Sequence, residues 1–89
     1  MKSAIRVRVI GLVQGVYFRA STQIKANKLD STGWVKNTDN GEAHIEATGS
    51  EESLKKLTAW LYKALQFALV KQVVESIAMS ESFDGFDIL

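Results

Sequence analysis

The stretch that decides the fold is Gly33 to Ala47, GWVKNTDNGEAHIEA, near the middle of the chain. Its centre, Asp39-Asn40-Gly41, is a strong hairpin-turn sequence, because asparagine and glycine adopt positive φ at low cost. Trp34 to Lys36 precede the turn as the start of a strand. From Ala43 to Ala47 apolar and polar residues alternate, which is the period of a half-buried strand. We therefore predict an antiparallel hairpin here, with its second strand ending at Gly49.

Before the hairpin, the alternation of Ile5, Val7 and Val9 with two arginines indicates another half-buried strand. The spacing of apolar residues from Phe18 to about Leu29 then becomes helical.

After the hairpin, Ser50 is a good N-cap, and leucines recur at steps of three and four from Leu54 to about Ala68. The β-branched stretch Val70 to Met79 indicates a strand, with a bulge expected at Val73-Val74 because its alternation breaks there. Asp84 to Ile88 is a candidate short edge strand.

The expected order is strand, helix, strand, strand, helix, strand, which is the split βαβ or ferredoxin-like arrangement. We predict one α+β domain over residues 1–89, with an antiparallel sheet, both helices on one face and a possible short fifth edge strand. The polar residues of the strands, Arg6, Arg8, His44 and Glu46, would lie on the opposite, wetter face.

Composition excludes several classes of protein. The net charge is +1, so nothing favours nucleic acid or an anionic membrane surface as a partner. The chain has no cysteine, which excludes disulfides and thiolate metal sites and makes the cytoplasm the expected compartment. No apolar run approaches the roughly 20 residues of a membrane span.

The link between the first strand and the first helix, GLVQGVYFR at residues 11–19, is a candidate anion site. A glycine-containing loop that enters a helix gathers free backbone N–H groups, here on Gly15, Val16, Tyr17, Phe18 and Arg19. The guanidinium of Arg19 would match two phosphoryl oxygens. Spacing alone, however, favours a plainer interpretation, in which the glycines allow a tight turn and Arg19 makes a surface ion pair.

Two other polar residues, Asn37 and His44, are candidates for a functional role. Asn37, at the end of the strand before the turn, could hold a water for attack, because its amide both donates and accepts. On its own it is better explained as a turn residue. His44, the only histidine, is expected to face solvent rather than act as a base or metal ligand, and no metal-ligand cluster is evident.

Taken together, the two segments resemble the acylphosphatase family. Its first signature, G-x-V-Q-G-V-x-F/Y-R, matches Gly11 to Arg19, and its second, G-W/Y/F-V/A-K/R-N with a later hairpin glycine, matches Gly33 to Asn37 and Gly41. The later Gly49 and the closing Gly85 to Ile88 also look like family features. The resemblance covers nearly the whole chain, and it reverses the plainer interpretations of Arg19 and Asn37.

The resemblance implies hydrolysis of acyl phosphates to carboxylate and inorganic phosphate, without a metal or other cofactor. It assigns phosphate binding to Arg19 and the Gly15 to Arg19 backbone, with Gln14 in support. It assigns orientation of the attacking water to Asn37, with Thr38 helping to fix Asn37. A catalytically silent phosphate-binding or ligand-binding module of the same fold is the alternative.

The chain departs from the family pattern at two places. Ala64 to Leu69 replaces a loop rich in glycine and proline, so the second helix should run longer or the loop should be unusually apolar. We expect a monomer, with Phe67 and Leu69 as a surface through which copies could associate. Asp30 stands where members usually place a glycine after the first helix.

Overall fold

The computed structural model describes residues 2–11, 16–66, 72–78 and 83–89. The elements follow in the predicted order, with the fifth strand present. They are β1 (Lys2–Ile10), α1 (Val16–Lys28), β2 (Thr32–Asn37), β3 (Glu42–Ser50), α2 (Glu51–Gln66), β4 (Gln72–Ile77) and β5 (Phe86–Ile88). This is the predicted ferredoxin-like α+β arrangement.

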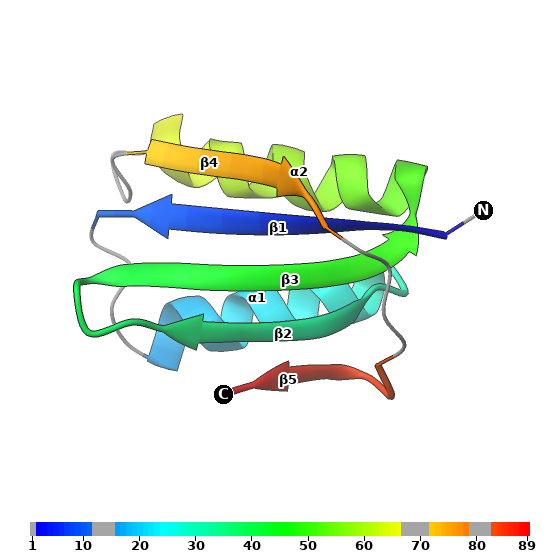
Figure 1. Cartoon of the computed structure of the whole chain (residues 1–89), viewed down its shortest axis with the longest axis horizontal. Helices are drawn as coiled ribbons and strands as arrows, with labels where there is room; N and C mark the ends of the chain where they lie inside the picture. The colour runs from blue at the N-terminus through cyan, green and yellow to red at the C-terminus, as the bar shows by residue number, and fades with distance from the viewer. Residues whose placement is uncertain (1, 12–15, 67–71, 79–82) are drawn as a thin grey trace.

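The strands form one sheet in the order β4-β1-β3-β2-β5, and both helices cover the same face of it (Figure 1). The pairs among β4, β1, β3 and β2 are antiparallel, as predicted. The expectation of a wholly antiparallel sheet is wrong at β5, which runs parallel to β2. β4 ends, and β2 and β5 begin, at the same end of the sheet (Figure 1), so β5 runs in the direction of β2.

The core lies between the sheet and the helices. Alternate residues of β1 and β3 point into it, and α2 contributes leucines at helical spacing. Its largest fully buried apolar side chains are Ile45, Leu57, Leu61, Val7, Val9 and Val35.

Two positions of the central hairpin require glycine for steric reasons. Gly33 has φ of 142°, and a Cβ built there would lie 1.8 Å from the carbonyl oxygen of Glu46 on the paired strand. Any side chain would push β2 away from β3 just before Trp34. Gly41 has φ of 84° at the turn, which confirms the hairpin predicted from Asp39-Asn40-Gly41.

Two details of the predicted strands are wrong. β3 does not end at Gly49 but continues to Ser50, and Gly49 pairs with Ser3 of β1. β4 has no bulge, because Val73 and Val74 pair in unbroken register with Val9 and Arg8.

The start of α2 agrees with the prediction. The Ser53 amide donates to Ser50 Oγ at 3.1 Å, and Glu51 and Glu52 lie in the first turn, where the helix dipole favours negative charge. The helix is described as far as Gln66. Residues 67–71, which include Phe67 and Leu69, lie outside the described residues. The surface through which copies could associate is therefore untested. In the described part of the chain, no helix is both long and apolar enough to cross a membrane.

Asp30 ends α1 in a left-handed conformation, with φ of 53°. The Ser31 amide donates to the carbonyl of Ala26 at 2.9 Å, and the Asp30 amide donates to the carbonyl of Asn27 at 3.1 Å. These two bonds define a Schellman motif, in which the left-handed position is usually glycine. Asp30 therefore adopts the left-handed cap conformation expected from the sequence.

Replacing Asp30 with glycine should stabilise the protein. Glycine removes the steric cost of the left-handed conformation, so we expect a gain on the order of 1 kcal/mol in the free energy of unfolding. That gain corresponds to a rise of about 4–8 °C in the thermal midpoint of a domain this small. Asp39→Gly is the control, because positive φ is not found at Asp39. A midpoint for Asp30→Gly at or below that of the wild type would contradict the argument.

Candidate functional site

Asn37 is the last residue of β2 and lies on the helix-covered face of the sheet. Strand residues alternate between faces, so Asn37 shares the face of the fully buried Val35, two residues earlier. It pairs with Ala43, the last register pair before the hairpin turn. The Asn37 side chain is thus held at the end of the strand and directed toward the helix layer rather than toward the open face.

Arg19 lies in the first turn of α1, at the same end of the sheet. In Figure 1 the end of β1, the start of α1 and the ends of β2 and β5 gather on one side of the molecule. Arg19 Nη1 donates to the carbonyl oxygen of Leu89, just after β5, at 3.4 Å. That distance is at the outer limit of a hydrogen bond, so this contact holds the guanidinium only weakly.

Within the described part of the chain, four buried side-chain polar atoms have no hydrogen-bond partner. Two of them are Arg19 Nε and Asn37 Oδ1, and the other two are the hydroxyl oxygens of Ser31 and Thr48. A buried polar atom without a partner costs free energy, so such atoms call for an explanation. Arg19 Nε can therefore donate, and Asn37 Oδ1 can accept, one further hydrogen bond.

The backbone part of the predicted cradle is described in part. Gln14 and Gly15 lie outside the described residues, and Val16 to Arg19 form the first turn of α1. The first four amides of a helix have no acceptor within it, and the helix dipole adds partial positive charge there. No acidic residue occupies this turn, so the turn contains no negatively charged side chain that would repel a bound anion.

Thr38 organises the hairpin turn that follows Asn37. Its amide donates to the carbonyl of Glu42 at 2.8 Å, and its hydroxyl accepts from the Glu42 amide at 3.2 Å and contacts Asn40 Oδ1. No hydrogen bond joins Thr38 to Asn37 Oδ1. Support of Asn37 by Thr38 would therefore act through the turn, and it stays a prediction.

The open face of the sheet carries ion pairs across its strands. Arg6 donates to Glu46 at 2.6 Å, and Arg8 binds both carboxylate oxygens of Glu42 at 3.1 and 3.0 Å. The same Glu42 lies 3.0 Å from Nε2 of His44. The predicted polar face is confirmed, but the sequence analysis did not predict that Glu42 contacts both Arg8 and His44. Among the described residues, no group of three or more potential metal ligands occurs.

Ionisation of Glu42 should make the free energy of unfolding depend on pH in the acid range. Hydrogen bonds from Arg8 and His44 lower the pKa of Glu42 from 4.5 to about 2 in the folded protein. The stabilisation is therefore complete above pH 4.5, and it is lost as the pH falls from there toward 2.

Urea unfolding between pH 6 and pH 2 would test this prediction. Glu42→Gln should be less stable than the wild type at neutral pH and should lose stability less steeply in acid. Equal pH slopes for the two proteins would show that Glu42 does not titrate as argued.

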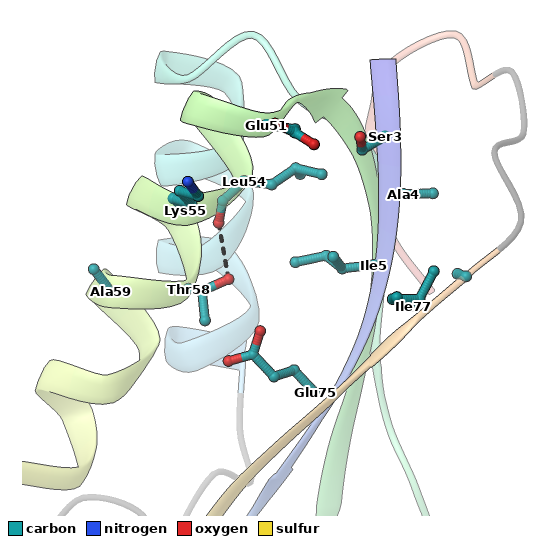
Figure 2. A pocket seen from close by; sticks show the side chains of 11 residues that line it. Ser3, Ala4, Ile5, Glu51, Leu54, Lys55, Thr58, Ala59, Glu75 and Ile77 are labelled. Atoms are coloured by element: carbon teal, nitrogen blue, oxygen red, sulfur yellow. Dashed lines mark hydrogen bonds between the residues drawn. The ribbon is translucent and has the colours of Figure 1, made fainter. Parts of the chain in front are cut away.

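A groove of about 660 Å³ elsewhere in the molecule contains none of the predicted site residues. It lies between α2, the first residues of β1 and the last residues of β4, at the end of β1 opposite to the α1 start (Figure 2). Leu54 and Ile5 point into it, and the charged side chains among its described lining residues are Glu51, Lys55 and Glu75. Two carboxylates against one ammonium group make this lining unfavourable for a small anion, so the candidate site remains the Arg19–Asn37 end.

Gln23 makes a contact that the sequence analysis did not predict. Its Nε2 donates to the carbonyl oxygen of Phe86 in β5 at 2.7 Å. Gln23 lies four residues after Arg19 and therefore on the same face of α1. That spacing was visible in the sequence, but the position of β5 beside α1 was not.

Comparisons with known proteins agree with both the fold and the signatures. The family model described as Acylphosphatase matches residues 5–88. An acylphosphatase of Bacillus licheniformis is 43% identical over 84 residues, covering 93% of this chain and 93% of the relative. The structure of an acylphosphatase from Coxiella burnetii has a TM-score of 0.89 at 38% identity, covering 99% of this chain and 93% of that one. The acylphosphatase structure from Bacillus subtilis has a TM-score of 0.88 at 34% identity, covering 100% and 99%.

Proposed function

This chain belongs to the acylphosphatase family and is a hydrolase of acyl phosphates, and we propose that it works without a metal, through Arg19 and Asn37. The observation that carries the assignment of residues is the pair of partnerless buried atoms, Arg19 Nε and Asn37 Oδ1. The start of α1 and the end of β2, to which they belong, lie on the same side of the molecule (Figure 1).

Arg19 and the backbone amides of the Gly15 to Arg19 cradle hold the phosphoryl group. The guanidinium neutralises charge on the equatorial oxygens, and the amides at the start of α1 donate to them. Gln14, which lies outside the described residues, is proposed as a supporting residue. Phosphoryl transfer depends mainly on positioning and charge stabilisation, so such a clamp provides much of what the reaction needs.

Asn37 orients the attacking water. Its Oδ1 accepts a hydrogen bond from the water, whose oxygen then forms the new bond to phosphorus. The bond from phosphorus to the acyl oxygen breaks, and its electron pair leaves on the carboxylate. The conjugate acid of that carboxylate has a pKa of roughly 4, so departure needs no general acid. The proton of the water is lost late, to a phosphoryl oxygen.

The acyl group would face solvent or a shallow cleft, so we propose broad specificity toward acyl phosphates, with inorganic phosphate as product and inhibitor. A monomeric state and a cytoplasmic location stay predictions from the sequence.

Hydrolysis of benzoyl phosphate by the purified protein, with and without EDTA, tests the function. We expect turnover well above the spontaneous rate, unchanged by the chelator and competitively inhibited by phosphate. Phosphate binding without turnover would instead indicate the silent binding module. Loss of turnover with EDTA would overturn the metal-free mechanism alone.

A further inference from the structure

β5 connects the two halves of the proposed site. It pairs in parallel with β2, where the Gly33 amide donates to the Gly85 carbonyl at 2.8 Å and the Leu89 amide donates to the Val35 carbonyl at 2.9 Å. Val35 is two residues before Asn37. β5 is therefore fixed to the strand that ends in the proposed water-binding residue.

The carbonyl of Phe86 is not used in that pairing. Alternate residues of a strand direct their backbone groups to opposite sides, so Phe86, next to Gly85, turns its carbonyl away from β2. Gln23 Nε2 donates to this carbonyl at 2.7 Å, a short and partly buried bond. The amide of Gln23 thus attaches α1 to the outer edge of β5.

Among the described residues, two side-chain hydrogen bonds join α1 to this segment, and the bond made by Gln23 is the stronger. Arg19 itself reaches Leu89 at only 3.4 Å, in an exposed position. Gln23 lies one helical turn further along the same face, so it sets the distance of α1 from β5 and thereby the position of Arg19. The Phe86 side chain is buried in the core, so its carbonyl is a rigid acceptor.

We propose that Gln23 is a positioning residue, which places the guanidinium of Arg19 relative to Asn37 through β5 and β2. This inference rests on the proposed function of Arg19 and Asn37. Its physical basis is that a misplacement of about 1 Å in a catalytic group can cost about 10²-fold in rate.

Gln23→Met tests the proposal, because methionine has similar length and no charge but cannot donate to the Phe86 carbonyl. We expect weaker binding of inorganic phosphate, by about tenfold, and a similar fall in kcat/KM for benzoyl phosphate. Gln23→Glu, which also lacks a donor at pH 7, provides a second variant should the first fold poorly.

Tyr62→Phe is the matched control. It removes the bond of 3.1 Å from the Tyr62 hydroxyl on α2 to Glu75 on β4, a helix-to-edge-strand contact at the opposite edge of the sheet. We expect phosphate affinity and kcat/KM like those of the wild type. If the Gln23 variants match Tyr62→Phe in phosphate affinity and kcat/KM, Gln23 is only structural and the proposal is overturned.

A double-mutant cycle with Arg19→Lys shows whether Gln23 acts through Arg19. In the Arg19→Lys background the loss caused by Gln23→Met should largely disappear, because the group that Gln23 positions has changed. An undiminished loss would overturn the proposal even if the function stands. Failure of the function itself is recognised separately, by the absence of turnover in the wild type.

Discussion

Arg19→Gln is expected to abolish the binding of inorganic phosphate and the turnover of benzoyl phosphate. Glutamine removes the positive charge and the planar fork that neutralise the phosphoryl oxygens in the proposed clamp. Arginines that stabilise phosphoryl-transfer transition states are worth about 10³-fold or more, so kcat should fall by at least that factor. Steady-state kinetics and calorimetric titration with phosphate measure the two effects.

Arg6→Gln is the matched control for this substitution. Arg6 makes an ion pair with Glu46 on the open face of the sheet, away from the helix-covered face that Asn37 occupies. Its loss should lower stability, because the buried Glu46 loses both hydrogen bonds from Arg6, but it should leave phosphate binding and turnover of the folded protein unchanged. If Arg19→Gln retained turnover, or if Arg6→Gln lost it equally, the clamp would be wrongly assigned.

The local features of the fold could be predicted from the sequence because each depends on neighbouring residues. The Ser50 cap and the hairpin at Asn40-Gly41 follow from backbone preferences within a few positions, whereas the left-handed end of α1 at Asp30 was expected from the family pattern. The bulge predicted at Val73-Val74 is wrong because both valines are accommodated, one buried on the helix face and one half-buried on the open face. Alternation alone cannot anticipate a strand that packs on both sides.

Contacts between distant segments could not be predicted. Glu42 meets Arg8 only after β1 and β3 have paired, and Gln23 meets Phe86 across a separation of 63 residues. The parallel direction of β5 likewise depends on its pairing with β2, which lies far away in the sequence. Arg19 and Asn37 were identified because their surrounding signatures were recognised, while neither residue carried enough local signal alone.

Asn37→Ala is expected to preserve phosphate binding and to lose turnover. Alanine removes the amide that orients the water, while Arg19 and the helix amides still hold the phosphoryl group. Loss of one preorganised hydrogen-bonding group at a reacting centre typically costs about 10²–10³-fold in kcat. Removing a buried oxygen without a partner should also leave the protein folded, because no hydrogen bond to Oδ1 is broken.

Asn40→Ala and Asn37→Asp separate the possible causes of such a loss. Asn40 lies in the same hairpin and contacts the Thr38 hydroxyl, so its variant tests whether a loosened turn alone reduces activity. We expect Asn40→Ala to keep most of its turnover. Asn37→Asp keeps the shape of the side chain but adds a negative charge, so it should weaken phosphate binding as well as turnover. Normal turnover by Asn37→Ala would contradict the water-orienting role, whereas weaker phosphate binding would place Asn37 in the clamp itself.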